Sequence, residues 1–181
     1  MIGTIERGDI MFDRFYPSER QESAYTIDFR RLYQKGYKGI LFDIDNTLVP
    51  HGADADNRAK ALFKELEEIG FQTCLISNNQ KERVERFNQE IHTNYIYNAH
   101  KPSGKNYREA MEIMGTNLTN TVFVGDQLFT DVFGAKRIGM YTVLVNPINP
   151  KEEIQIILKR YLERIVLFFY EKKKRTEKNE R

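Results

Sequence analysis

Short apolar runs alternate along the middle of the chain with segments in which apolar positions recur every three or four residues. The runs have the length and the β-branched content of strands. They lie at 38–43, 72–77, 93–97, 121–126 and 141–145. Their apolar residues are consecutive, which is typical of strands buried on both faces, and the segments between them have the helical period. We therefore predict an α/β fold, a Rossmann-like three-layer α/β/α sandwich with a five-stranded, mainly parallel sheet.

Two flanking segments do not follow this alternation. Residues 1–36 contain an aromatic loop and then a short helix that we expect to begin near Asp28 and to end at Gly36. Residues 151–181 combine an amphipathic stripe with a basic tail. The stripe consists of Ile154, Ile157, Leu158, Tyr161, Leu162, Ile165, Phe168 and Phe169, opposite Lys159, Arg160, Glu163 and Arg164. The sequence thus predicts an N-terminal flank, a core over 37–150 and a C-terminal helix with its tail.

Composition limits the class of protein. The 181 residues are 40% hydrophobic, with 12 Phe and 10 Tyr, which is enough apolar surface for a core and excludes a disordered chain. The formal net charge is only +2, and no recognised binding motif appears, so we expect no nucleic-acid partner. The single Cys74 cannot form an internal disulfide, and the first residues do not read as a secretory signal. We expect a cytoplasmic protein.

Polar side chains follow four of the five strands at the point where each strand ends. They are Asp43, Asp45 and Thr47 after the first strand, Ser77 and Asn78 after the second, Lys101 after the third, and Asp126 and Asp131 after the fourth. Because the carboxyl ends of parallel strands meet at one edge of a sheet, we expect these side chains to share a pocket. Ser77 and Asn78 are also expected to cap the helix that begins near Gln80.

Carboxylates gathered in one pocket need a positive charge. Two of them about 5 Å apart repel by on the order of 3 kcal/mol at an effective dielectric constant of about 20. Oxygen ligands without Cys or His suit Mg²⁺, which is commonly shared with a substrate phosphate. Lys101 adds a second cation, and the hydroxyl of Thr47 or Ser77 adds a neutral donor. The pattern predicts a metal-assisted phosphate site.

The segments LFDIDNTLV, ISNN, HKPSG and VGDQLFTD occur in this order between residues 40 and 131. They resemble the four motifs of the haloacid dehalogenase superfamily of phosphatases. The segment DQLFTDVFGAKRIGM is similar to the subfamily IIIA branch, which includes phosphatidylglycerophosphate phosphatases. The resemblance implies that residues 37–150 form a catalytic core of this type, that Asp43 is the nucleophile and that Asp45 is the acid and base.

The resemblance also implies roles for the remaining motif residues. Mg²⁺ would be bound by the carboxylates of Asp43 and Asp126 and by the backbone carbonyl of Asp45. The phosphoryl group would be held by Thr47, Ser77, Asn78 and Lys101. Asp131 would lie outside the ligand set and orient it.

The spacing of the motifs bears on the substrate. The chain advances 34 residues from Asp43 to Ser77 and 24 from Ser77 to Lys101, too few for a cap domain of about 50 residues. We therefore expect an open site without a cap. Such a site suits a phosphorylated small molecule or lipid headgroup, and the resemblance favours a phospholipid precursor such as phosphatidylglycerophosphate.

Several alternatives stay open. The substrate could instead be a soluble sugar phosphate, a nucleotide or a polynucleotide end. A phospho-acceptor signalling domain would carry its Asp after the third strand rather than the first, and a non-catalytic scaffold would not need the intact motif residues. The C-terminal helix either docks on the core or makes peripheral contact with a membrane, where the basic tail would face anionic lipid. No pattern in the sequence indicates the oligomeric state.

Overall fold

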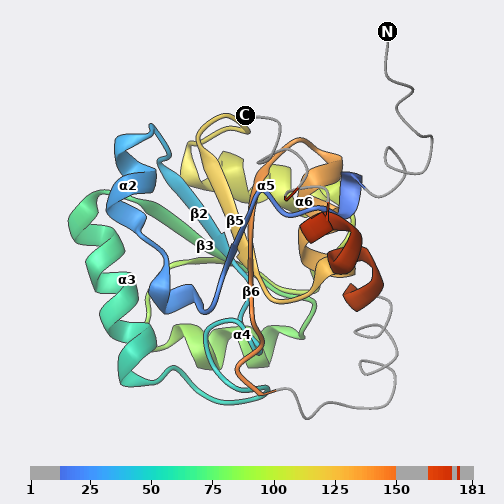
Figure 1. Ribbon diagram of the computed structural model, residues 1–181. Helices are drawn as coiled ribbons and strands as arrows, with labels where there is room; N and C mark the ends of the chain where they lie inside the picture. The colour runs from blue at the N-terminus through green and yellow to red at the C-terminus, as the bar shows by residue number, and fades with distance from the viewer. Residues whose placement is uncertain (1–12, 150–162, 173–174, 176–181) are drawn as a thin grey trace, which may run out of the picture.

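The computed structural model describes residues 13–149, 163–172 and 175 (Figure 1). Six parallel strands form one sheet in the order β1-β6-β5-β2-β3-β4. The strands are β1 (Glu19–Gln21), β2 (Gly39–Phe42), β3 (Gln72–Ile76), β4 (Asn94–Ile96), β5 (Thr121–Gly125) and β6 (Tyr141–Val145). The helices are α2 (Phe29–Gln34), α3 (Asn57–Ile69), α4 (Lys81–Asn88), α5 (Gly104–Met114) and α6 (Phe133–Arg137), with single turns η1 (Asp13–Phe15), η2 (Ala24–Thr26) and η3 (Leu128–Val132).

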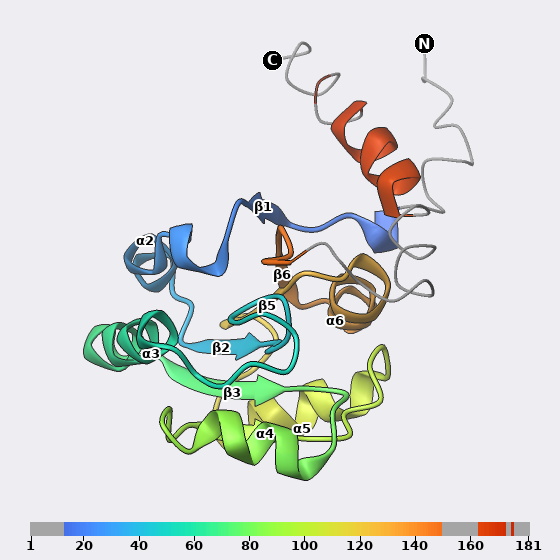
Figure 2. The same ribbon diagram turned by 90° about the horizontal axis from the view of Figure 1, so that it is seen from below.

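Successive side chains of the strands enter two apolar layers on opposite faces of the sheet. Ile40 and Phe42 of β2 pack in the layer that contains the buried residues of α2, α3 and α4. Leu41 packs in the layer that contains those of α5 and Ala135 of α6. The sheet therefore lies between helices on both faces, as Figure 2 shows, and the predicted three-layer sandwich is confirmed.

Local signals in the sequence define where the helices begin and end. Asp28 accepts a hydrogen bond from the N–H of Arg31 at the start of α2, and Asp56 accepts one of 2.8 Å from Ala59 at the start of α3. Gly70 ends α3 in the left-handed region, at a φ of +102°, where glycine is least strained. The five strands predicted from apolar runs all form, each within one residue of its predicted ends.

The sheet has six strands rather than the five predicted, because β1 joins it at one edge. β1 pairs only with β6, and its residues Glu19, Arg20 and Gln21 are polar and half-buried. Short, charged edge strands of this kind lack the apolar run that marks a central strand. A side chain of β6 helps to position β1, because the N–H of Ser18, just before β1, donates to Thr142 Oγ1 at 3.1 Å.

The central strands place the predicted site at one edge of the sheet. β2 lies between β3 and β5, so Asp43, Ser77 and Asp126 follow neighbouring strands at the same edge. Between Asp43 and Lys101 the chain forms only α3, β3, α4 and β4 of the fold. This edge is therefore left without a cap domain within residues 13–149.

The C-terminal helix turns a different face to the core from the one predicted. Residues 163–172 are helical and lie beside η1 (Figures 1 and 2). Glu163, expected on the solvent face, is buried, whereas Phe168 of the predicted apolar stripe is 66% exposed. Val166 packs with Leu128 and Leu144 on the core side. Glu163 is buried because its carboxylate accepts a hydrogen bond from the N–H of Leu128 in the core, a partner that helical periodicity cannot reveal. The stripe positions up to 162 lie outside the described residues.

Candidate active site

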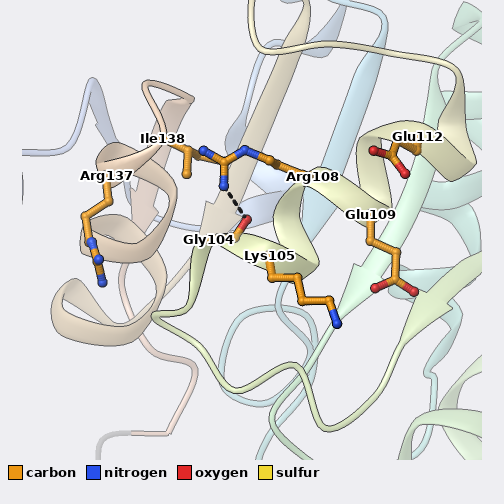
Figure 3. Close-up of a pocket in the computed structure, with 7 residues that line it drawn as sticks. All are labelled: Gly104, Lys105, Arg108, Glu109, Glu112, Arg137 and Ile138. Atoms are coloured by element: carbon orange, nitrogen blue, oxygen red, sulfur yellow. Dashed lines mark hydrogen bonds between the residues drawn. The ribbon is translucent and has the colours of Figure 1, made fainter.

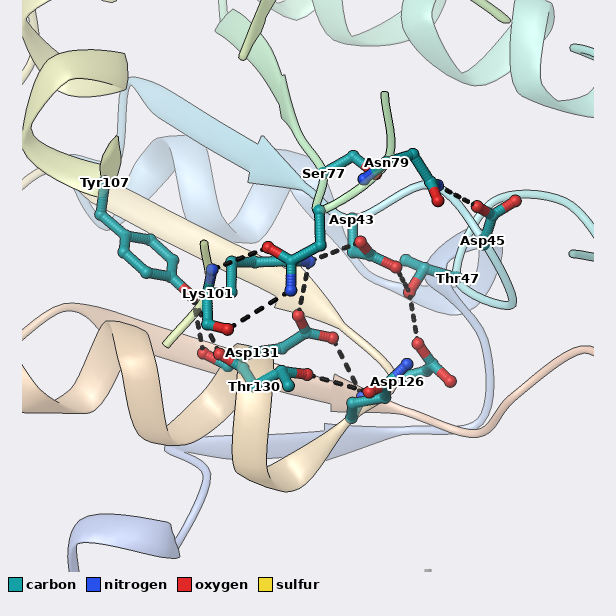
Figure 4. A network of polar contacts seen from close by, with 12 residues as sticks. Asp43, Asp45, Thr47, Ser77, Asn79, Lys101, Tyr107, Asp126, Thr130 and Asp131 are labelled. Carbon is teal, nitrogen blue, oxygen red and sulfur yellow. Dashed lines mark hydrogen bonds and ion pairs between the residues drawn. The ribbon is translucent and has the colours of Figure 1, made fainter. Parts of the chain in front are cut away.

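A buried lysine lies at the centre of the site. Lys101 Nζ is 2.5 Å from Asp43 Oδ1 and 2.7 Å from Asp131 Oδ1, and its side chain is only 3% exposed (Figure 4). Burial alone would lower the pKa of Lys101, but the two carboxylates outweigh it and raise the pKa. Lys101 is therefore a permanent positive charge between two acidic side chains.

Three carboxylates converge around this charge. Oxygens of Asp43, Asp126 and Asp131 all lie within 4.8 Å of one another, and all three residues are buried. Thr47 Oγ1 donates to Asp126 Oδ1 at 3.2 Å, which links the loop after β2 to the end of β5. Burial raises the pKa of Asp43 despite the nearby Lys101, and Asp131 raises it further. This cluster carries more negative charge than one lysine neutralises, so it is suited to a cation.

The turn after β5 brings Asp131 back to the cluster. Asp131 Oδ2 accepts a hydrogen bond of 3.0 Å from the N–H of Gln127, and its Oδ1 faces Lys101. Tyr107 Oη donates to the carbonyl of Thr130 at 3.1 Å and so supports the same turn from α5. The absence of a side chain at Gly125 makes this approach possible, because a Cβ there would lie 2.5 Å from Asp131 Oδ2.

Asp45 belongs to a second polar group beside the cluster. Its Oδ1 accepts from the N–H of Gly52 at 2.9 Å and from Arg83 Nη2 at 2.8 Å, and its Oδ2 accepts from Asn79 Nδ2. Burial raises the pKa of Asp45, but these hydrogen bonds and the charge of Arg83 outweigh burial, so the pKa lies below its usual range. Asp45 is therefore held as a carboxylate in this arrangement.

Arg83 is a site residue that sequence reasoning missed. It extends from α4, and its Nη2 also donates to the carbonyl of Ala53 at 2.7 Å, while its side chain is only 12% exposed. Within the described part of the chain, its Nε and Nη1 are buried without a hydrogen-bond partner. The contacts of Nη2 with Asp45 and Ala53 therefore define its position. An arginine four residues after ISNN, on the inward side of a short helix, was the available signal.

The residues after β3 connect the two polar groups. Asn78 accepts a 2.7 Å hydrogen bond from the N–H of Lys101 and donates to the Lys101 carbonyl at 3.3 Å. Ser77 Oγ, buried at the end of β3, accepts from the N–H of Asn79 at 3.2 Å. Neither residue caps α4 as predicted, because α4 begins only at Lys81 and its cap position, Gln80, makes no side-chain hydrogen bond. Asn78 orients Lys101 instead.

A cavity of about 600 Å³ lies elsewhere, between α5 and the end of α6 (Figure 3). It is lined by Gly104, Lys105, Arg108, Glu109, Glu112, Arg137 and Ile138. None of these residues belongs to the predicted site, and basic and acidic side chains are mixed along the wall. Its three basic and two acidic side chains do not converge on one point as the carboxylates do around Lys101, so the carboxylate and lysine cluster is the better candidate site.

Comparison with known proteins agrees with this geometry. A family model described as haloacid dehalogenase-like hydrolase matches residues 51–139. The protein named Probable phosphatase YqeG, from Bacillus subtilis (strain 168), is 35% identical over 154 residues, which are 84% of this chain and 90% of that protein. The chain belongs to the haloacid dehalogenase superfamily of phosphatases. The resemblance seen in the four motifs is thereby confirmed.

Two further comparisons describe a relative of this phosphatase and a structure that resembles it. The Arabidopsis thaliana protein named Phosphatidylglycerophosphate phosphatase 1, chloroplastic/mitochondrial, is 29% identical over 148 residues, which cover 72% of this chain and 40% of that protein. A crystal structure of an uncharacterized protein from Listeria monocytogenes serotype 4b has a TM-score of 0.51 at 17% identity, over 65% of this chain and 84% of that one. The structural likeness shows that the fold is shared.

The donor set of this phosphatase fits Mg²⁺. The clustered atoms of Asp43, Asp126 and Asp131 are all carboxylate oxygens, the ligand type that Mg²⁺ prefers. Asp131 interacts with Lys101 and the Gln127 amide, and Asp43 interacts with the same lysine, so the cluster offers three carboxylates that could hold the ion. Among the residues that the structure describes, no helix has the length and apolar character needed to cross a bilayer.

Proposed function

We propose that this phosphatase hydrolyses a phosphomonoester through an aspartyl-phosphate on Asp43, depends on Mg²⁺, and acts on a phospholipid precursor such as phosphatidylglycerophosphate. The observation that carries the proposal is the convergence of Asp43, Asp126 and Asp131 on Lys101 at the end of the central strands. A nucleophilic carboxylate needs nearby positive charge to approach an anionic phosphate, and Lys101 together with a bound cation would supply it.

In the first proposed step, an oxygen of Asp43 attacks phosphorus, and the bond between phosphorus and the leaving-group oxygen breaks. Asp45 gives a proton to the departing oxygen, so it must carry that proton when the substrate is bound. Lys101, together with the hydroxyls of Thr47 and Ser77, would hold the phosphoryl oxygens. Asp43, Asp126 and the carbonyl of Asp45 would hold Mg²⁺, which would supply further positive charge near the transferring group.

In the second step, water attacks the aspartyl-phosphate, Asp45 takes its proton, and phosphate leaves with Asp43 restored. The structure favours the base form of Asp45 that this step needs, because Arg83, Asn79 and the Gly52 amide all donate to its carboxylate. Asp45 ends this step protonated again, so the cycle itself restores the proton that the next leaving group needs.

The lipid part of the proposal rests on three observations. A relative named for phosphatidylglycerophosphate matches 72% of this chain. The site edge has no cap domain within residues 13–149, so a large headgroup could reach it. Ile165, Phe168 and Phe169 of the C-terminal helix are exposed apolar side chains, which suits peripheral contact with a membrane.

A substrate panel tests the activity. Purified protein with Mg²⁺ is assayed for phosphate release from phosphatidylglycerophosphate in mixed micelles, from its headgroup without acyl chains, and from sugar phosphates, nucleotides and phosphorylated oligonucleotides. We expect the highest kcat/KM on the lipid and loss of release with chelator, restored by added Mg²⁺. Preference for a soluble phosphate would overturn the lipid assignment. Turnover that survives chelation would overturn the proposed dependence on Mg²⁺.

Membrane contact is tested separately by co-sedimentation with anionic vesicles. The double substitution Ile165→Ser and Phe168→Ser should lower the bound fraction of the full chain severalfold, because it removes exposed apolar surface from the C-terminal helix. Ile113, an exposed apolar residue of α5, gives the matched control, and Ile113→Ser should bind as the wild type does. Equal binding by all three proteins would exclude this contact surface.

A further inference from the structure

The buried carboxylate of Glu163 contacts the turn that carries Asp131. Its Oε1 accepts a 2.8 Å hydrogen bond from the N–H of Leu128, and Glu163 is only 7% exposed. Leu128 is the first residue of η3, and the preceding residue, Gln127, makes no side-chain cap hydrogen bond to this turn. The first N–H groups of a helical turn have no partner within it and need an outside acceptor. Glu163 supplies that acceptor from 35 residues away in the sequence.

The capped turn leads directly to the reacting groups. Asp131 lies within η3, and its Oδ1 is 2.7 Å from Lys101 Nζ, which in turn is 2.5 Å from Asp43 Oδ1. Asp126 lies two residues before Leu128. A shift of the turn would therefore move both acidic residues of the fourth motif relative to Asp43.

The C-terminal helix has its own attachments to the core, so Glu163 is not needed merely to keep it in place. Val166 packs with Leu128 and Val132, and Arg20 Nη1 lies 3.1 Å from Glu171 Oε1 at the other end of the helix. The contact of Glu163 differs from these because it is a hydrogen bond from a backbone N–H of η3, the turn that contains Asp131.

We infer that Glu163 is a positioning residue: it caps η3 from the C-terminal helix and thereby holds Asp126 and Asp131 in place for metal and phosphate. The inference extends the proposed function, because it assigns part of the metal affinity to a segment outside the four motifs. Residues that orient metal-binding carboxylates from outside the ligand set typically contribute 10-fold to 100-fold in affinity.

Metal binding by the full-length protein tests the inference. In titration calorimetry without substrate, Glu163→Ala should raise the Kd for Mg²⁺ by about 10-fold or more. Glu163→Gln keeps a carbonyl acceptor and should stay within about threefold of the wild type. Glu171→Ala is the matched control. Glu171 lies on the same helix as Glu163, and its replacement breaks the ion pair with Arg20 of β1 without touching η3. Glu163→Met, which keeps the side-chain length, replaces the alanine variant if that one does not fold.

Hydrogen exchange gives a second measurement that does not depend on the metal. Loss of the cap should raise the exchange rate of the Leu128 amide by at least about 10-fold in Glu163→Ala and not in Glu171→Ala. If the wild type binds Mg²⁺ but Glu163→Ala binds it equally well and protects Leu128 equally well, the inference is wrong. If the wild type binds no Mg²⁺, the proposed metal site fails, and the exchange data alone decide whether Glu163 caps the turn.

Discussion

Lys101 shows how one buried charge organises the residues around it. It is held from two sides, by the carboxylates of Asp43 and Asp131 at its Nζ and by Asn78 at its backbone. Burying an ammonium group is costly unless it is paired and hydrogen-bonded, and here the pairing is with the proposed nucleophile itself. The same contacts that stabilise Lys101 therefore prepare Asp43 for an anionic substrate.

Replacement of the nucleophile should separate activity from stability. Asp43→Asn should lower phosphate release by about 10⁴-fold or more, because an amide cannot form the acyl phosphate. The thermal midpoint should stay near that of the wild type, since Asn has the same shape and Lys101 keeps Asp131 as its partner. A colorimetric phosphate assay and a melting curve measure the two effects, and normal turnover by the variant would refute the role of Asp43.

Arg83 should affect kcat/KM only for substrates whose leaving group needs a proton, because kcat/KM reports the first step of the cycle. Arg83→Gln removes the contact that holds Asp45, so kcat/KM on an alkyl phosphate should fall by at least about 10-fold, within the range of acid–base catalysis. The kcat/KM for p-nitrophenyl phosphate should change little, because nitrophenolate leaves without being protonated in the first step. Steady-state kinetics on both substrates measure the difference.

Arg86 provides the control for Arg83. It lies on the same helix and donates to the carbonyl of Gly52 and to Asp54, so it holds the same loop without contacting Asp45. Arg86→Gln should leave the ratio of the two kcat/KM values unchanged. An equal loss on both substrates in Arg83→Gln would mean that Arg83 supports the loop and not Asp45.

Helix starts decide how the loops of the site are anchored. The loop that contains Asp45 and Gly52 ends at Asp56, whose carboxylate caps α3. The loop that contains Ser77 and Asn79 ends at Gln80, which caps α4 without a side-chain hydrogen bond. One loop is thus held at its far end by a capping side chain, and the other by its contacts with Lys101 and Asp45.

These two cap positions form a matched pair for a stability measurement. Asp56→Ala should lower the free energy of unfolding by about 1 kcal/mol, because the N–H of Ala59 loses its acceptor. Gln80→Ala should change it by less than about 0.5 kcal/mol. Urea unfolding followed by circular dichroism gives both values, and similar losses in the two variants would contradict the capping argument.

The whole molecule contains buried or half-buried weak acids that are neutral at physiological pH. Burial raises the pKa of Cys74 to about 12, and it raises those of Tyr25 and Tyr141 to about 12 as well. Their ordinary values are 9.0 for the thiol and 10.0 for the phenols. The unfolded chain therefore ionises first as the pH rises, and the folded state loses the stability that these groups contribute.

The thermal midpoint should accordingly fall between about pH 9 and pH 12. The contribution of each group is fully present below its unfolded pKa and is lost as the pH rises through its folded pKa. We expect a fall of at least about 4 °C from pH 9 to pH 11 in melting curves. Tyr141→Phe should reduce the fall, whereas Tyr97→Phe, at an exposed position, should not. A midpoint independent of pH over this range would show that these groups ionise freely in the folded protein.

The layered fold and most of the site could be read from the sequence because both depend on local order. Apolar runs marked the five strands, and motif residues at their ends had to meet because parallel strands end at one edge. Asp43, Thr47, Lys101, Asp126 and Asp131 do contact one another as expected. Chain connectivity and the pleat of the strands were sufficient to bring these groups together.

What the sequence left undecided depends on contacts between residues that are distant along the chain. β1 has no apolar run and is a strand only because β6 offers it a partner. Glu163 looked solvent-facing and is buried because the Leu128 amide, in a turn of the core, needs an acceptor. Arg83 joins the site because Asp45 lies within reach of α4. Each of these positions satisfies a hydrogen-bonding group that only the packed fold brings near, so no local pattern could have predicted them.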